Sequence, residues 1–280
     1  MCVSVYLSIN LKIMIIAVTN QKGGVGKTTS VLNIGVFLAK KGKKVLLVDI
    51  DPQANLTSGL GIERDRENDG FISIYDVLVN QEEVKSSIKK SRVENLSVIP
   101  SSIELAGAEV EMVNAMSRES VLKKALDQVK DEFDYIIIDC PPSLGLLTIN
   151  SQVAADLVVI PVQAEYYALE GLGQLMNTIK LVKSNLNPNL DIGGVVLTMF
   201  DSRTNLSKDI ALELKNHFDD KLFETLVPRN IKLSEAPSHG LAIVEYEPES
   251  SGAQAYDRLT QEIIDRFEKN NSKTLVRPKI

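Results

Sequence analysis

Short runs of apolar and β-branched residues alternate with longer amphipathic segments along the whole chain. Most of the short runs are continuously apolar, which is typical of strands buried on both faces of a sheet. The predicted strands are Ile15–Thr19, Lys44–Asp49, Leu96–Pro100, Tyr135–Asp139, Leu157–Pro161, Gly194–Met199 and Lys221–Val227. The amphipathic segments predict helices at Ser30–Lys41, Ser120–Lys130, Leu169–Ser184 and Ser207–Phe218. The alternation indicates right-handed βαβ crossovers, and therefore an α/β fold with a mainly parallel, twisted sheet and helices on both faces.

The 280 residues are expected to form a single domain. The length alone would also allow two small domains, but no Pro/Gly/Ser-rich linker and no internal repeat divides the sequence. Met14 stands directly before the first predicted strand, so we expect residues 1–13 to be a flexible leader and the domain to cover residues 14–268. Residues 63–70 are expected to form a polar surface loop, and residues 269–280 a frayed, basic C-terminal tail.

Composition narrows the class of protein without naming a function. The net charge of −6 gives no general attraction to nucleic acid, so any DNA contact must come from a local basic patch. Cys2 and Cys140 lie far apart, which argues against a disulfide framework and favours a reducing compartment. No uninterrupted apolar stretch is long enough to cross a membrane. We therefore expect a cytoplasmic protein without a membrane partner.

A glycine-rich segment follows the first predicted strand and precedes a helical pattern, which is the context of a phosphate-binding loop. It reads Lys22-Gly23-Gly24-Val25-Gly26-Lys27-Thr28-Thr29. Glycines let backbone N–H groups surround phosphates, and the positive end of the following helix favours them. Lys27 is expected to contact the β- and γ-phosphates, and Thr28 to offer a hydroxyl to Mg²⁺. A glycine-rich turn without a ligand is the alternative, and the spacing argues against it.

Two further predicted strands end in aspartates. Asp49 and Asp51 follow one buried strand, and Asp139 ends another. Ligands of open parallel sheets gather beyond the carboxyl ends of the strands, so these acids are expected to converge on the phosphate loop. A single aspartate in such a place is often only a helix cap or a turn residue. Three acids in this order behind a phosphate loop favour a site.

The loop departs from the standard pattern, because Gln21 stands at the position of the first glycine and Lys22 precedes two glycines. In this form it resembles the deviant Walker A motif of the ParA/MinD family. The resemblance implies a slow, Mg²⁺-dependent ATPase that forms a sandwich homodimer around ATP. It also implies that Lys22 reaches the partner subunit's phosphates, with Gly23 where the subunits meet. The simpler alternative for Lys22 is a solvated surface lysine.

The resemblance assigns roles to further residues. Asp51 would orient the attacking water, Asp139 would hold Mg²⁺ through water, and Asp49 would support the site. The implied catalytic residues are Lys22, Lys27 and Asp51, and the implied magnesium ligands are Thr28 and Asp139. The implied nucleotide-binding residues are Gly23, Gly24, Val25, Gly26, Lys27, Thr28, Thr29, Pro228 and Arg229.

Other segments share the resemblance to the ParA/MinD family, namely Asp51–Asn55, Asp139–Ser143 and Pro161–Gln163. Two further blocks are similar specifically to Soj-type chromosomal ParA proteins: Arg203–Leu206, and Pro228–Asn230 through Leu233–Gly240. This similarity implies chromosome or plasmid partitioning: an ATP-bound dimer that binds double-stranded DNA without sequence preference, on the nucleoid, until a ParB-type centromere-binding partner stimulates hydrolysis. The implied DNA contacts are Arg203 and Lys232. Bases barely outnumber acids between them, so solvated surface charges are the alternative.

Three other functions remain open. A MinD-like ATPase that positions the division site would need a C-terminal amphipathic helix, and residues 270–280 are poor in apolar residues and contain Pro278. A metabolic enzyme of the same fold would need cluster-bridging cysteines or a second substrate motif, and neither is recognisable. A ParA-like positioner of another cargo is poorly separated by sequence from a partitioning ATPase.

Overall fold

The computed structural model describes residues 13–62, 70–165 and 170–274. Within them, a seven-stranded sheet has the order β3-β4-β2-β5-β1-β6-β7, and all neighbours are parallel except β3, which is antiparallel to β4. The strands are β1 Met14–Val18, β2 Val45–Asp49, β3 Lys89–Lys90, β4 Leu96–Ile99, β5 Tyr135–Asp139, β6 Leu157–Gln163 and β7 Asp191–Thr198. The predicted single-domain α/β fold with a mainly parallel sheet is confirmed.

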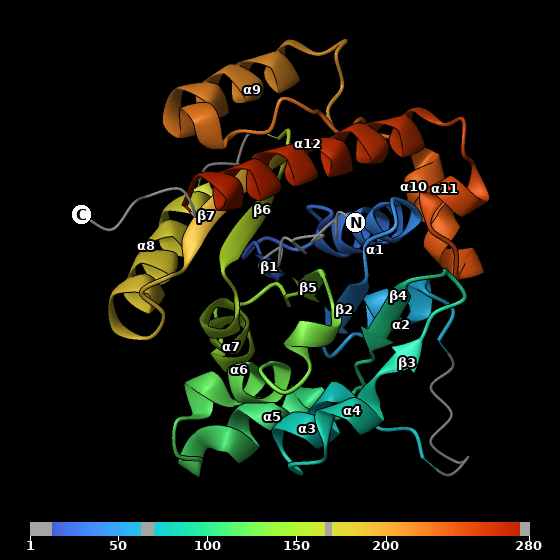
Figure 1. Cartoon of the computed structure of the whole chain (residues 1–280). Helices are drawn as coiled ribbons and strands as arrows, with labels where there is room; N and C mark the ends of the chain where they lie inside the picture. The colour runs from blue at the N-terminus through green and yellow to red at the C-terminus, as the bar shows by residue number, and fades with distance from the viewer. Residues whose placement is uncertain (1–12, 63–69, 166–169, 275–280) are drawn as a thin grey trace, which may run out of the picture.

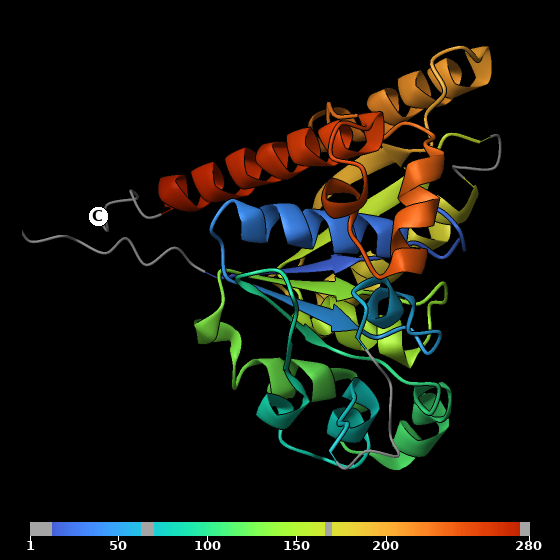
Figure 2. The same ribbon diagram turned by 90° about the vertical axis from the view of Figure 1, so that its right-hand side faces the viewer.

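Helices cover both faces of the sheet (Figures 1 and 2). In Figure 2, α1 and α12 lie above the sheet, whereas α3, α4 and α6 lie below it. The α-helices are α1 Lys27–Lys40, α2 Asn55–Gly59, α3 Ile74–Leu78, α4 Val84–Ser87, α5 Leu105–Glu111, α6 Val121–Leu126, α7 Leu146–Ala154, α8 Glu170–Asn185, α9 Asn205–Phe218, α10 Ile231–Glu235, α11 Ile243–Tyr246 and α12 Ser251–Thr274. The 3₁₀ helices are η1 Met112–Asn114, η2 Arg118–Ser120, η3 Lys130–Glu132, η4 Asp219–Lys221 and η5 Ala236–His239.

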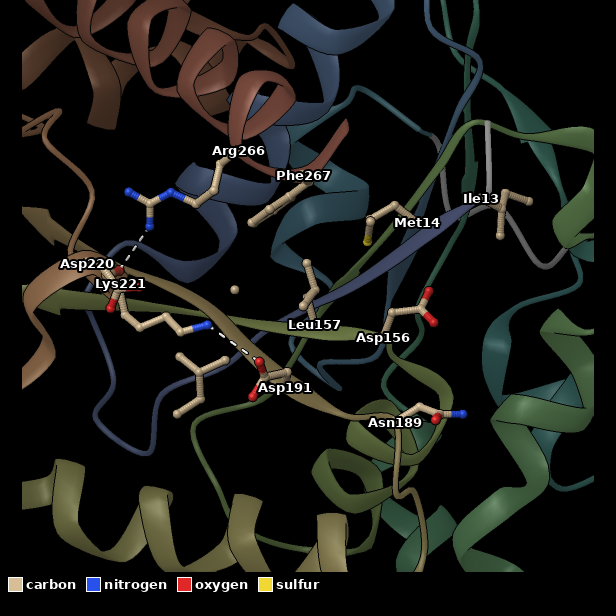
Figure 3. A pocket seen from close by; sticks show the side chains of 12 residues that line it. Ile13, Met14, Asp156, Leu157, Asn189, Asp191, Asp220, Lys221, Arg266 and Phe267 are labelled. Carbon is tan, nitrogen blue, oxygen red and sulfur yellow. Dashed lines mark hydrogen bonds and ion pairs between the residues drawn. The ribbon is translucent and has the colours of Figure 1, made fainter. Parts of the chain in front are cut away.

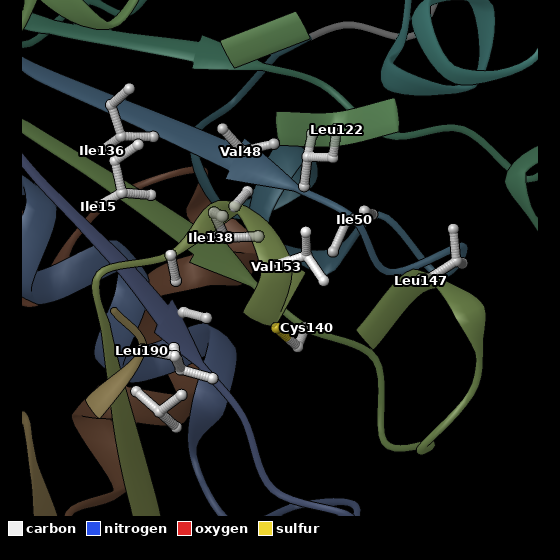
Figure 4. Packing of buried hydrophobic residues seen from close by; sticks show 14 of the residues in the cluster. Ile15, Val48, Ile50, Leu122, Ile136, Ile138, Cys140, Leu147, Val153 and Leu190 are labelled. Carbon is white, nitrogen blue, oxygen red and sulfur yellow. The ribbon is translucent and has the colours of Figure 1, made fainter. Parts of the chain in front are cut away.

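The continuous apolar strands fill two separate cores, because successive side chains of a strand point to opposite faces. Ile15 and Ala17 of β1 belong to one core, and Ile16 and Val18 to the other. Figure 4 shows the first core, where strand residues meet side chains of α6 and α7. Burial on both faces explains why these strands lack the alternating pattern of a half-exposed sheet.

The long helix α12 closes the second core by packing on α1. The buried hydroxyls of Tyr256 on α12 and Ser30 on α1 lie 3.1 Å apart, within hydrogen-bond distance. The last helix of the chain therefore lies directly on the helix that follows the glycine-rich loop.

The predicted strand Lys221–Val227 is wrong. Its first residue ends η4, Leu222 makes an isolated bridge to Val195, and the backbone N–H groups of Phe223 and Val227 donate to β7 without forming a continuous strand. The cause is the carboxylate of Glu262, which accepts hydrogen bonds from the backbone N–H groups of Glu224 (2.8 Å) and Thr225 (3.1 Å). These amides are directed to α12 and are not available to a strand ladder. Conversely, the two-residue strand β3 was too short to leave a pattern.

Helix boundaries also differ from the prediction. Helix α1 begins at Lys27, immediately after the loop glycine, and α6 already ends at Leu126. The backbone of α12 continues to Thr274, so residues 269–274 are helical and not the frayed tail that was expected. The expected leader up to residue 12, most of the expected loop (residues 63–69), Leu169 and residues 275–280 lie outside the described residues.

Gly194 on β7 provides a test of the close packing at the sheet edge. A Cβ atom there would lie 2.5 Å from Cε2 of Phe223 and 3.0 Å from the backbone oxygen of Lys221. Because backbone must move to make room, we expect Gly194→Ala to lower the free energy of unfolding by about 1–3 kcal/mol. Urea denaturation measures the change. The control is Gly173→Ala on α8, which meets no atom within 4 Å and should stabilise by up to about 1 kcal/mol. Equal effects at both glycines would contradict the packing argument.

Candidate nucleotide-binding site

The glycine-rich loop has the backbone conformation that its glycines allow. Gly24 and Gly26 have φ angles of 73° and 87°, a region that other residues rarely adopt. Gly26 also precedes the first turn of α1 and accepts its backbone hydrogen bond from Ser30. The hydroxyl of Thr198, at the end of β7, donates to the backbone oxygen of Val25 at 2.8 Å. The loop is thus shaped by glycine and fastened to the neighbouring strand.

The register of the sheet brings the predicted acids to this loop. Strand β5 lies between β1 and β2, and Asp139 is opposite both Val18 and Asp49. The carboxyl ends of β1, β2 and β5 therefore lie side by side at one edge of the sheet, as expected for parallel strands.

Lys27 lies inside the loop. Its side chain is nearly buried, and Nζ donates to the backbone oxygen of Lys22 at 3.1 Å. Burial lowers the pKa of Lys27, while the nearby carboxylates of Asp139 and Asp51 act in the opposite direction. A buried cation among backbone amides is suited to phosphate oxygens.

Asp139 is fully buried, and neither carboxylate oxygen has a hydrogen-bond partner among the described residues. Burial raises the pKa of Asp139 well above its ordinary value, and the charge of Asp49 adds to the shift. The hydroxyl of Thr28 and the ammonium of Lys27 partly oppose it. Unsatisfied carboxylate oxygens beside a hydroxyl suit a hard divalent cation. The described residues contain no group of three or more acidic, His or Cys side chains that could hold a metal.

Asp49 has a structural role. Its Oδ2 accepts hydrogen bonds from the backbone N–H (2.8 Å) and the hydroxyl (2.7 Å) of Thr57, and Oδ1 accepts one from the backbone N–H of Asp51 (3.2 Å). Burial raises the pKa of Asp49 to about 6, although these hydrogen bonds favour its charged form. The carboxylate thereby ties α2 to the end of β2, in agreement with the supporting role expected for it.

Asp51 lies on the same segment with its side chain 7% exposed. Its Oδ1 accepts a hydrogen bond from the backbone N–H of Gln53 at 2.9 Å, and its backbone oxygen accepts one from the hydroxyl of Ser101 at 2.7 Å. The carboxylate is held in place near Lys27, whose pKa it affects. Its role toward a water molecule stays a prediction.

Lys22 has a different environment from Lys27. Its side chain is 39% exposed, and Nζ lies 3.3 Å from Oε2 of Glu165 in the same chain. Arg229 approaches the other oxygen of this carboxylate, with Nη2 3.7 Å from Oε1. The backbone N–H of Arg229 donates to the oxygen of Phe200 at 3.1 Å, which fixes the Pro228–Arg229 segment beyond the end of β7. Lys22 and Arg229 are thus brought together at the rim of the loop.

The two expected DNA contacts lie outside the loop, and each is paired with a carboxylate. The Arg203 guanidinium binds both oxygens of Asp201, at 2.9 and 2.7 Å, and lowers the pKa of that carboxyl group. Lys232 on α10 lies 2.8 Å from Oε2 of Glu235, which raises the lysine pKa. No hydrogen bond or ion pair joins Arg203 to Lys232 in the described part of the chain.

Sequence reasoning missed three residues of this region: Glu165, Thr198 and Thr57. Glu165 and Thr198 contact loop residues from a distant part of the chain, so sequence spacing does not reveal them. Thr57 is only eight residues from Asp49, but no motif marks it. One sequence signal could have pointed to Glu165 and Thr198, because both stand at or just beyond the carboxyl end of a strand, where ligands gather.

A second cavity of about 480 Å³ lies at the opposite, amino ends of β1, β6 and β7 (Figure 3). Lys221 and Asp191 in it lie 3.4 Å apart, and Arg266 donates to the backbone oxygen of Lys221 at 3.2 Å. These charges are satisfied within the chain, which does not favour a charged ligand there.

Comparison with known proteins places the chain in a family. Residues 13–192 match the family model described as AAA domain. The chain is 60% identical to the sporulation initiation inhibitor protein Soj of Bacillus subtilis, over 89% of this chain and 97% of that protein. It is 51% identical to the chromosome-partitioning ATPase Soj of Treponema pallidum, over 88% and 95% of the two chains. The chain belongs to the Soj/ParA family.

A solved relative agrees with the fold and the cofactors expected for a Soj/ParA protein. It is described as cobyrinic acid a,c-diamide synthase from Mycobacterium smegmatis with bound ADP and magnesium, and it is 36% identical with a TM-score of 0.80. The match covers 92% of this chain and 96% of that one. The predictions of a Soj/ParA ATPase, and of ATP and Mg²⁺ as its cofactors, are therefore confirmed at the level of the family.

Thr57 tests how the buried Asp49 is held. Thr57→Val removes the hydroxyl that donates to Asp49 and that also accepts the backbone N–H of Ser101 at 2.9 Å. We expect a loss of about 1.5–3 kcal/mol in the free energy of unfolding, because a buried charge loses a donor. Chemical denaturation measures it. The control Thr178→Val removes only an exposed bond to Gln174 and should change stability by less than about 0.5 kcal/mol. Similar losses for both variants would argue against the proposed support.

Proposed function

We propose that the protein is an ATP-timed switch for chromosome or plasmid partitioning. In this proposal MgATP closes a homodimer, the dimer binds double-stranded DNA non-specifically on the nucleoid in the cytoplasm, and a ParB-type partner stimulates hydrolysis and release. The names of its relatives support the process. The site geometry supports different roles for Lys27 and Lys22, one toward the nucleotide of its own chain and the other toward that of a second copy.

The separate placement of the two lysines is the observation that carries the proposal. Lys27 is buried inside the loop, where it can serve the phosphates of its own chain. Lys22 begins at the same loop, but its ammonium lies outside at the rim and is partly exposed. A second lysine with this placement is not needed for a complete loop within one chain. It is available to a nucleotide held by a second copy, and the site is then complete only in a dimer.

The other residues support catalysis by positioning. Phosphoryl transfer requires mainly aligned reactants and compensation of developing charge. Bound Mg²⁺ would supply positive charge beside the phosphates, with Thr28 and Asp139 as the residues that would hold it. Asp51 would orient water, Gly23–Thr29 would surround the phosphates, and Pro228–Arg229 would frame the base. Slow hydrolysis follows if the site depends on Lys22 of the partner subunit, which suits a timer.

Helix α10 lies close to the phosphate loop, which supports nucleotide control of DNA binding. Thr28 and Thr29 line a cavity of about 400 Å³ together with Leu233 and Ser234 of α10. Lys232 is the neighbour of Leu233 on the same helix. DNA phosphates would have to replace Glu235 beside Lys232 and Asp201 beside Arg203, and a dimer would double the number of such bases. The net negative charge of the chain does not favour DNA binding. The proposal therefore includes dimerisation, which brings the bases of two copies to the same DNA.

Two observations bear on the alternatives. No described helix is both long and apolar enough to cross a bilayer, and the side chains needed to judge a C-terminal membrane-surface helix lie outside the described residues. Burial raises the pKa of the Cys140 thiol to about 12, which does not favour a cluster-binding thiolate. A ParA-like positioner of another cargo would use the same switch, and the binding partner distinguishes it.

DNA co-sedimentation tests the switch. Wild type, Lys22→Ala and Asp51→Ala are each measured without nucleotide, with ADP and with ATP, at fixed salt. We expect wild type to bind DNA with ATP, Asp51→Ala to stay bound for longer because hydrolysis is blocked, and Lys22→Ala to lose binding because the dimer is incomplete. Absence of DNA binding in every state would refute the partitioning mechanism.

A second experiment tests the DNA contact of Arg203. Arg203→Ala should keep ATP binding but weaken DNA retention, and the slope of log K against log salt should fall by about 1 for each DNA phosphate that is no longer neutralised. The control Lys90→Ala removes an exposed charge from β3, at the opposite edge of the sheet from β7. Unchanged DNA retention by Arg203→Ala, or an equal loss in Lys90→Ala, would count against the assignment.

A further inference from the structure

Glu165 lies between the two bases at the rim of the loop. Its Oε2 is 3.3 Å from Nζ of Lys22, and its Oε1 is 3.7 Å from Nη2 of Arg229. The side-chain amide of Gln163 also donates to Oε1. One carboxylate, 45% exposed, therefore contacts both a lysine and an arginine that the proposed function assigns to nucleotide.

The contact directs Lys22 toward its own chain. Glu165 follows β6, and the phosphate loop follows β1, so the ion pair connects two neighbouring strands of one sheet. The carboxylate does not contact Lys27, which is engaged with the backbone inside the loop. The ion pair at 3.3 Å holds the Lys22 ammonium against its own chain. Phosphates presented by a second subunit would compete with Glu165 for the same ammonium.

We propose that Glu165 is a positioning residue that retains Lys22 within its own subunit and must release it when the ATP-bound dimer forms. The proposal rests on the proposed function and adds a regulatory contact to the same site. A triphosphate carries several negative charges, so it outcompetes a single carboxylate once a partner subunit presents it. Without that partner, Glu165 is the carboxylate that pairs with Lys22 among the described residues. The contact opposes dimerisation until nucleotide is loaded.

The expected size of the effect on dimerisation follows from the exposure of the Lys22–Glu165 ion pair. Lys22 and Glu165 are 39% and 45% exposed, and ion pairs of this kind contribute little to stability in water. Removing the carboxylate should therefore change the dimer dissociation constant by only about two- to fivefold. A change of this size adjusts the protein concentration at which dimers form and leaves the switch itself intact.

Sedimentation velocity tests the proposal with Mg²⁺ and a non-hydrolysable ATP analogue, over a range of protein concentrations. Glu165→Gln keeps the size of the side chain and removes its charge. We expect its dimer dissociation constant to fall about two- to fivefold below the wild-type value, while the variant stays monomeric without nucleotide. Glu165→Ala should change the constant in the same direction. Urea denaturation verifies that both variants fold.

Two controls separate a specific role from a general charge effect. Glu132→Gln breaks a comparably exposed pair with Lys85, at 2.9 Å, and should leave dimerisation unchanged. In the Lys22→Ala background Glu165→Gln should give no gain, because the lysine on which it acts is absent. A gain in that background would overturn the proposed route through Lys22.

The outcomes distinguish this proposal from the function on which it rests. If wild type dimerises with the analogue and Glu165→Gln dimerises equally or more weakly, the positioning role is wrong and the switch stands. If wild type stays monomeric at every concentration, the dimer of the proposed function is wrong and the role of Glu165 is refuted with it.

Discussion

The pairing of β5 with both β1 and β2 is the constraint on which the site depends. Asp139 is in register with Val18 and with Asp49. Strands β1, β2 and β5 therefore end at the same level of the sheet. The phosphate loop follows β1 and the carboxylates follow β2 and β5, so pairing of these strands is enough to bring them together. A shift of one residue in this register would move Asp139 to the opposite face, because strand side chains alternate with a period of two.

The paired strands bring more acidic than basic side chains into the buried region beside the phosphate loop. Asp49, Asp51 and Asp139 gather at one edge of the sheet with one buried cation, Lys27, and burial together with the neighbouring carboxylates raises the pKa of Asp49 and of Asp139. Hydrogen bonds from Thr57 compensate Asp49, whereas the Thr28 hydroxyl and the Lys27 ammonium offset the burial of Asp139 only in part. A site with this balance is prepared for a divalent cation and is electrostatically strained without one. Affinity for Mg²⁺ is thus a consequence of how the strands end.

Local patterns predicted the parts of the structure that depend on neighbours in sequence. The loop, the aspartate-tipped strands and the parallel sheet all followed from continuous motifs, and relatives and fold bear out the family and architecture. Lys221–Val227 failed because Glu262, far along the chain, withdraws its amides from the ladder. Glu165 was missed for the same kind of reason, since its importance arises only when β6 lies beside β1. The nearest partners of Arg203 and Lys232 are local carboxylates, and the expected contact of these two bases with DNA stays a prediction.

The packing of α12 on α1 has a consequence for how the protein is made. Helix α1 leaves the ribosome early, whereas Tyr256 of α12, which packs on it, is synthesised much later. At about 5–20 residues per second, the apolar surface of α1 stays uncovered for roughly 10 s or more. Until α12 emerges, the nascent chain therefore exposes an aggregation-prone surface on the helix that follows the phosphate loop. Loss of the C-terminal helix, by a premature stop or by proteolysis, would leave every phosphate-binding residue in the sequence and yet uncover the helix that supports them.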